Sequence, residues 1–96
     1  MSDARWDDRK ERDNRAAHGV GFPEAATVFK DPDSVTWFDG RHSRREDRYL
    51  TVGVSDIGRL LTVVTAFDKE GKVRVISARR PSGRERNAYA TRRPPT

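Results

Sequence analysis

Arginines dominate the groups in this chain that could do chemistry. Sixteen of its 20 basic side chains are arginine, whose planar guanidinium can grip a phosphate through two parallel hydrogen bonds and can stack on a nucleobase. Residues 1–39 hold six basic and nine acidic side chains, a net charge of −3, whereas residues 40–96 hold fourteen and six, a net charge of +8. The C-terminal part therefore predicts a polyanion-binding surface. An arginine-rich solubilising surface, or one for an acidic protein partner, is the alternative.

Glu46 and Arg48 form the first candidate site. They lie two residues apart at the start of an expected strand, so both side chains project from the same face of the sheet. A carboxylate beside a cation suits an active site, where the carboxylate could accept a proton. An ordinary cross-strand ion pair explains the same spacing equally well.

The charged segment before Gly19 predicts a helix with a polar stripe. Trp6, Lys10, Asn14 and His18 recur every four residues, which places them along one side of that helix. If Trp6 anchors the helix in the core, Lys10 and His18 face the sheet together and supply a cation and a proton donor. Alternatively, Trp6 simply fills the core, and Asn14 and His18 bond to turn backbone near Gly19.

Arg79 and Tyr89 are candidates near the C-terminus. Arg79 leaves the last expected strand where the sheet ends, and its expected role is to clamp a phosphate. It could instead, or in addition, neutralise a carboxylate such as Glu46 or Glu85. Tyr89 on the last expected helix could stack on a base or donate a proton, although an aromatic residue at that spacing also suits core packing.

Two adjacent aromatic residues precede a basic loop. Trp37 and Phe38 face opposite ways in an expected strand, so one is expected in the core and the other exposed for contact with a partner. His42 lies in the loop that follows; it is one of the possible bases of the chain, although a solvated position is the simpler interpretation. The arginines of this loop are Arg41, Arg44 and Arg45.

Hydrophobic periodicity predicts the elements that position these groups. Helices are expected from residue 7 or 8 to about 17, over 22–29, and from 82 to just before 94. Strands are expected over 35–39, 48–55, 59–67 and 73–79. The order predicts an α+β domain with two N-terminal helices, a three- to four-stranded antiparallel sheet and a C-terminal helix.

Composition narrows the class of protein further. Ninety-six residues predict one domain, and the absence of cysteine and of any apolar run long enough to cross a membrane favours a cytoplasmic protein without membrane contact. Two well-separated histidines cannot supply a metal-ligand cluster, and no glycine motif that cradles nucleotides occurs. We therefore expect no metal and no cofactor.

Several motifs, in the same order over about ninety residues, resemble the BrnT toxins of bacterial type II toxin-antitoxin systems. That family is similar in fold to the RelE ribonucleases. The resemblance covers residues 5–90 of a single domain over 1–96, which leaves 91–96 as an expected flexible tail. The matching residues are Trp6, Asp7, Lys10, Asn14, His18, Gly19, Val20, Phe22, Glu24, Ala25, Ala26, Glu46, Arg48, Gly53, Ile76, Ser77, Ala78, Arg79, Glu85, Arg86 and Tyr89.

This resemblance implies a metal-independent endoribonuclease that blocks translation. It also implies neutralisation by a cognate ribbon-helix-helix antitoxin, with operator DNA bound only through the toxin-antitoxin complex. RNA cleavage of this kind uses the neighbouring 2′-hydroxyl as nucleophile. The protein must then accept its proton, neutralise the pentacoordinate phosphorane and protonate the departing 5′-oxygen.

The candidate residues can be assigned to these steps. Arg79, Arg48 and Lys10 are expected to hold the phosphate, and Glu46 or His18 to handle protons, with Tyr89 as a further possible acid. Ala17 stands where the family resemblance leads us to expect a lysine, and the loop over 41–45 is unusually basic, which suggests that phosphate contact has moved to that loop. A non-catalytic nucleic-acid or protein binding module, or a degenerate toxin that only binds antitoxin, is the alternative.

Overall fold

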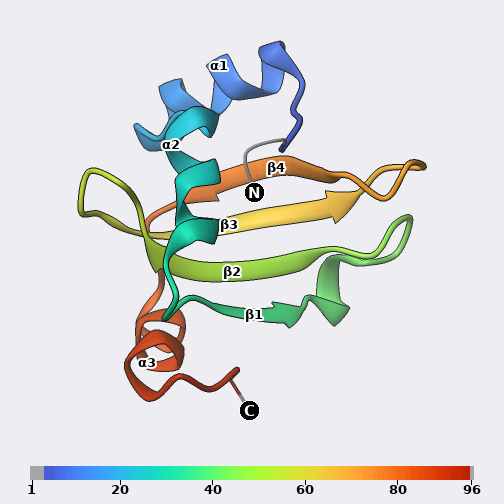
Figure 1. Ribbon diagram of the computed structural model, residues 1–96. Coiled ribbons are helices and arrows are strands. Elements are labelled where there is room, and N and C mark those ends of the chain that lie inside the picture. Colours follow the sequence, from blue (N-terminus) through green and yellow to red (C-terminus); the bar gives the residue numbers. More distant parts are fainter. Residues whose placement is uncertain (1–3, 96) are drawn as a thin grey trace.

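Four antiparallel strands form a sheet in which neighbours in sequence are also neighbours in space (Figure 1). The computed structural model describes residues 4–95. The strands are β1 (Val35–Phe38), β2 (Tyr49–Val54), β3 (Leu60–Phe67) and β4 (Val73–Arg79). One irregularity interrupts the register of β3 and β4, between Val64 and Thr65.

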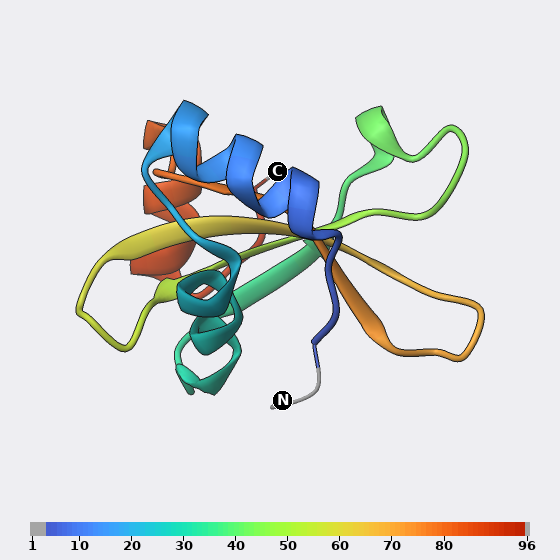
Figure 2. The same ribbon diagram turned by 90° about the horizontal axis from the view of Figure 1, so that it is seen from above.

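Helices cover parts of both faces and one edge of this sheet. Helix α2 (Phe22–Thr27) continues into a 3₁₀ turn, η1 (Val28–Lys30), and both lie on the front face in Figure 1. Helix α1 (Asp8–His18) runs along the outer edge of β4, and α3 (Gly83–Thr91) lies behind the sheet, as the view from above shows (Figure 2). The predicted α+β arrangement is confirmed, with four strands.

The hydrophobic core lies between the front face of the sheet and the segment that contains α2 and η1. One row of strand partners shows which side chains face this core. Thr51, Val63 and Ala78 lie side by side on neighbouring strands, and all three are buried. Gly53 allows a close approach here, because a Cβ atom at this position would lie 2.8 Å from Val28 Cγ1. The core cluster consists of Val20, Phe22, Ala25, Val28, Leu61, Val63, Val75 and Ala78.

The helix ends follow the predicted capping residues. The Asp7 side chain caps α1 at its start, and Gly19 ends it with a left-handed φ of 70°. Ser82 and Glu85 form the predicted capping box of α3. The second helix differs from its prediction: it is α-helical only to Thr27, because its last turn tightens into the 3₁₀ turn η1.

Helix α1 is oriented by one buried amide. The Asn14 side chain donates to the carbonyls of Val20 and Ala78 at 2.8 Å each and accepts from the Ala78 N–H at 3.1 Å. It therefore satisfies the backbone N–H and carbonyl of Ala78, as a neighbouring strand would.

Lys10 and His18 are exposed. Trp6 lies before the helix and packs against the core, edge-on to Phe22. The prediction that Lys10 and His18 face the sheet together is wrong, because four-residue steps rotate by about 40° around the helix and within α1 only Asn14 is buried.

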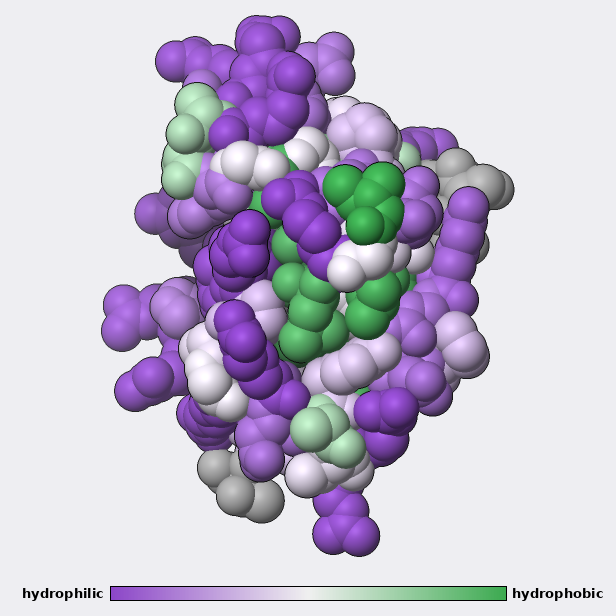
Figure 3. Space-filling model, turned by 90° about the vertical axis from the view of Figure 1, so that its left-hand side faces the viewer, coloured by the Kyte–Doolittle hydropathy of each residue, from purple (hydrophilic) through white to green (hydrophobic). Residues whose placement is uncertain are grey.

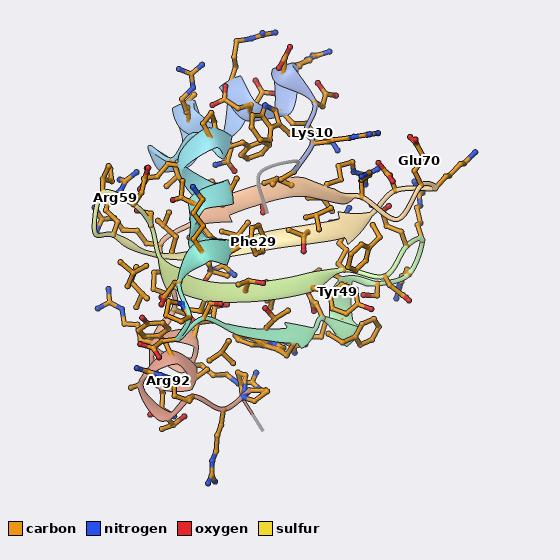
Figure 4. All side chains as sticks on the ribbon, viewed as in Figure 1. Lys10, Phe29, Tyr49, Arg59, Glu70 and Arg92 are labelled. Atoms are coloured by element: carbon orange, nitrogen blue, oxygen red, sulfur yellow. The ribbon has the colours of Figure 1, made fainter. Side chains whose placement is uncertain are left out.

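Trp37 and Phe38 point to opposite faces as predicted, but neither lies in the core. Phe38 is 50% exposed on the front face. Its ring contacts Tyr49 edge-on, and Tyr49 contacts Phe67 in the same way, with centroid distances of 5.7 Å in both pairs. Figure 4 shows Tyr49 on the part of this face that α2 leaves open. The expected core position for one of the two is wrong, because β1 is an edge strand that extends beyond the helices.

The remaining surface is mostly polar. Apolar side chains surrounded by polar ones gather on the side that Figure 3 shows, where the β2–β3 turn exposes Ile57. No helix within residues 4–95 is long and apolar enough to cross a membrane. Of the flexible tail expected over 91–96, Thr91 still belongs to α3, the Arg93 N–H bonds to the Ala88 carbonyl, and residue 96 lies outside the described residues.

Candidate active site

A groove of about 580 Å³ opens on the back of the sheet, opposite α2. It exists because α3 covers only one end of this face. Its floor is a row of strand partners that crosses all four strands: Trp37, Leu50, Val64 and Ser77. Most of the other lining residues are polar, among them Asp39, Arg41, His42, Arg48, Arg79 and Glu85.

Arg48 and Arg79 reach this groove from two different strands. Arg79 ends β4 two residues after Ser77, and Arg48 precedes β2 two residues before Leu50, so the alternation of a strand places both arginines on the groove side. The predicted phosphate-binding pair is therefore brought together. The third cation predicted for this role, Lys10, is on α1 and does not line the groove.

Arg79 is fixed in place by a carboxylate. Its Nη1 donates to Glu85 Oε1 at 2.7 Å and its Nη2 to Glu85 Oε2 at 3.0 Å, so the two side chains form a bidentate salt bridge. The side chain of Glu85 is only 10% exposed, and it also accepts from the Ser82 N–H and the Thr62 hydroxyl. The alternative interpretation of the sequence, that Arg79 pairs with Glu85, is confirmed. The predicted contact of Arg79 with a phosphate stays a prediction.

This network makes the free energy of unfolding depend on pH in the acidic range. Burial alone would raise the pKa of Glu85, but hydrogen bonds from Arg79, Ser82 and Thr62 outweigh it and lower the pKa from 4.5 to about 2. A carboxylate with a lowered folded-state pKa stabilises the protein above its unfolded pKa, and this contribution disappears as the pH falls from about 4.5 to about 2. Its size is on the order of 3 kcal/mol.

Urea unfolding between pH 6 and pH 2 measures this contribution. We expect the unfolding free energy of the wild type to fall more steeply below about pH 4.5 than that of Glu85→Gln, which lacks the titrating group. Glu70→Gln is the control, because the Glu70 side chain is 70% exposed and pairs with Arg5 at the surface, and it should keep the wild-type slope. Equal slopes for Glu85→Gln and the wild type would contradict the role of Glu85.

A short turn carries a second polar pair into the groove. The turn η2 (Gly40–His42) begins at Asp39, whose Oδ1 accepts from the Arg41 N–H. The other oxygen, Asp39 Oδ2, lies 2.9 Å from His42 Nδ1. Asp39 also lies close enough to Arg79 to help raise the pKa of that arginine, after the larger effect of Glu85. The sequence motifs did not single out Asp39, and for His42 they favoured a solvated loop over a role as a base. The Asp-x-x-His spacing was the available signal.

Glu46 lies beside the groove rather than in it. It accepts a hydrogen bond from Arg74, and its Oε1 is 3.8 Å from Arg48 Nη2, so the ion-pair interpretation of Glu46 and Arg48 describes their contact. Glu46 lines a shallow depression that shares three residues with the groove and continues it over the basic loop. The depression is lined by Arg41, His42, Arg44, Arg45, Glu46 and Arg48.

Tyr89 and His18 do not line the groove either. The Tyr89 hydroxyl donates to Asp31 Oδ2 at 2.7 Å, and the Arg92 guanidinium lies 4.9 Å from the ring centre. Burial and the Asp31 carboxylate raise the pKa of Tyr89, so it keeps its proton. Tyr89 thus fastens α3 to the turn before β1. Catalytic roles for Tyr89 and His18 remain predictions.

Comparison with known proteins identifies the family. A family model described as the ribonuclease toxin BrnT of type II toxin-antitoxin systems matches residues 6–85. The chain belongs to the BrnT family of ribonuclease toxins. The 1.1 Å crystal structure of the BrnT ribonuclease toxin of Brucella abortus has a similar fold: the TM-score is 0.60 at 19% sequence identity, over 85% of this chain and 99% of that chain. No curated protein sequence matches.

Membership of the BrnT family confirms the resemblance drawn from the sequence motifs. The matched residues 6–85 include Arg48 and Arg79, the Asp39–His42 pair and Glu85. The C-terminal part of α3, which contains Tyr89, lies beyond the match. All residues that line the groove, apart from Pro95, therefore lie within the part of the chain that matches the BrnT family.

Proposed function

We propose that this BrnT family member is a metal-independent endoribonuclease whose active site is the groove on the back of the sheet. It cleaves RNA by attack of a 2′-hydroxyl on the neighbouring phosphate and so blocks translation. The observation that carries this proposal is the convergence of Arg48 and Arg79, from two strands, on one groove whose floor includes Trp37. Two guanidinium groups can neutralise the charge that develops on the phosphorane.

The contacts of Arg79 support a catalytic use of this side chain. A guanidinium has five N–H donors. Within residues 4–95 the bonds of Arg79 to Glu85 and to the Arg80 carbonyl engage three of them. The Nε–H and one Nη2–H remain, and they lie on one edge of the guanidinium. That edge can hold two oxygens of one phosphate while Glu85 holds the opposite end rigid, so no reorganisation is needed during the reaction.

The floor and the adjoining loop suit single-stranded RNA. Trp37 is half-buried in the floor, where an unpaired base can stack on its ring. The arginines of the loop over 41–45 continue the positive surface away from Arg48, in the direction in which the neighbouring phosphates of a longer RNA would lie. An antitoxin, in this proposal a ribbon-helix-helix protein, neutralises the toxin by covering this charged groove close to Trp37 or Phe38.

Cleavage of a labelled RNA by the purified toxin in the presence of EDTA tests the proposal. We expect products that end in 2′,3′-cyclic phosphate, because the 2′-oxygen becomes bonded to phosphorus when the 5′-oxygen leaves. Addition of the antitoxin should stop the reaction. Tight, salt-sensitive binding that leaves the RNA intact would contradict the proposal and favour a binding module or a degenerate toxin.

A further inference from the structure

We propose that Asp39 and His42 form the proton-accepting pair of this groove, with His42 Nε2 taking the proton of the attacking 2′-hydroxyl. The inference rests on the proposed ribonuclease activity and names the base for it. His42 is then a catalytic residue, and Asp39 is the residue that positions it. The sequence offered His42 only as one of several possible bases and did not single out Asp39.

The backbone holds Asp39 in a fixed position. Its N–H donates to the Arg48 carbonyl at 2.8 Å, which extends the pairing of β1 and β2 by one step. Its carboxylate is only 12% exposed and caps η2 through the Arg41 N–H at 3.2 Å. The same carboxylate contacts His42 Nδ1 at 2.9 Å. The His42 side chain is 69% exposed and lines both the groove and the adjoining depression.

This contact selects the tautomer of the imidazole. A carboxylate only accepts hydrogen bonds, so in the neutral ring Nδ1 carries the hydrogen and donates it to Asp39 Oδ2. His42 Nε2 then holds the lone pair that can accept a proton. As the ring becomes positively charged, the Asp39 carboxylate stabilises it, in the way that a carboxylate supports the histidine of a catalytic triad.

Other charged groups around His42 suit a phosphate rather than a second base. Arg48 and Arg79 line the same groove, and Arg41, Arg44 and Arg45 lie on the same loop. The two carboxylates nearby are already engaged. Glu46 is bound by Arg74 and lies near Arg48. Glu85 holds Arg79, and its pKa of about 2 makes it a poor base near neutral pH.

In the proposed step, one proton moves to His42 and one phosphorus–oxygen bond replaces another. The 2′-hydroxyl proton passes to His42 Nε2, the 2′-oxygen forms a bond to phosphorus, and the bond from phosphorus to the 5′-oxygen breaks. The 5′-oxygen leaves with the bonding pair and takes a proton from solvent. The imidazolium, stabilised by Asp39, returns its proton to solvent. Arg48 and Arg79 neutralise the phosphorane throughout.

Single-turnover cleavage by His42→Ala, compared with RNA affinity measured in parallel, tests this assignment. We expect the cleavage rate to fall by about 100-fold to 10,000-fold, the usual contribution of general base catalysis, with the RNA dissociation constant changed by less than about threefold. Added imidazole should restore part of the rate to His42→Ala. Asp39→Asn keeps an oxygen for the cap of η2 but loses the charge, and should also slow cleavage.

The pH profile and a second histidine separate this role from a structural one. In the wild type the rate should rise with pH through the titration of one group, and His42→Ala should lose that dependence. His18→Ala tests the other histidine that the sequence offers as a base. Lys69→Ala is the control, because Lys69 is exposed in the β3–β4 turn and does not line the groove. Wild-type cleavage by His42→Ala, or loss of cleavage by His18→Ala alone, would overturn the assignment. Absence of cleavage in the wild type would instead remove the proposed function.

Discussion

Replacing Arg79 by lysine is expected to slow single-turnover RNA cleavage by about 100-fold or more, the loss typical when one preorganised donor to a developing charge is removed. Lysine keeps the positive charge, so it can still pair with Glu85 and the fold should persist. It lacks the second edge of the guanidinium, which in our proposal binds two phosphate oxygens while Glu85 holds the first. Cleavage rates with saturating enzyme, together with urea unfolding, measure both effects.

The choice of lysine rather than alanine matters for this test. Alanine would leave the buried Glu85 carboxylate without its cation, and breaking a buried pair in this way costs about 3–5 kcal/mol, so lost activity could reflect unfolding. Arg74→Lys is the matched control, because Arg74 lies on the same strand and pairs with Glu46, outside the groove. Equal activity of Arg79→Lys and the wild type would remove Arg79 from the active site.

Much of the fold could be predicted because its determinants are local. The alternation of apolar residues fixed β4 at 73–79 without error and the other strands to within one residue at each end. The ends of α1 and α3 followed from residues that satisfy the backbone within one turn, namely Asp7, Gly19, Ser82 and Glu85. Each of these signals involves residues close together in the chain.

The site was predicted only where strand alternation determines it. Arg48 and Arg79 share a face because each lies two residues from a floor residue, and that relation is visible in the sequence. The orientation of α1 depends instead on bonds between Asn14 and Ala78, and the position of Tyr89 on its bond to Asp31. These partners are far apart in sequence, so periodicity carries no information about them. Lys10 and His18 were consequently assigned to the wrong surface.

The arginines of the basic loop are expected to contribute strongly to RNA affinity. Replacing Arg41, Arg44 and Arg45 together by glutamine should make the plot of log affinity against log salt concentration shallower by about 2, since each phosphate contact to a single strand contributes about 0.7. This corresponds to roughly 50-fold weaker binding at 0.15 M salt if the affinities are equal at 1 M. Fluorescence anisotropy with a labelled oligonucleotide, measured over a series of salt concentrations, gives both values.

The same loss of charge at another place provides the control. Lys10, Lys30 and Lys69 are exposed and lie on α1, on η1 and in the β3–β4 turn, and none of them lines the groove or its continuation. Their triple replacement by glutamine should leave the salt dependence unchanged if RNA contacts the loop. Equal effects of the two triple variants would show that RNA affinity depends only on net charge. An effect of the lysine variant alone would indicate that RNA phosphates bind the surface that includes α1 and not the loop.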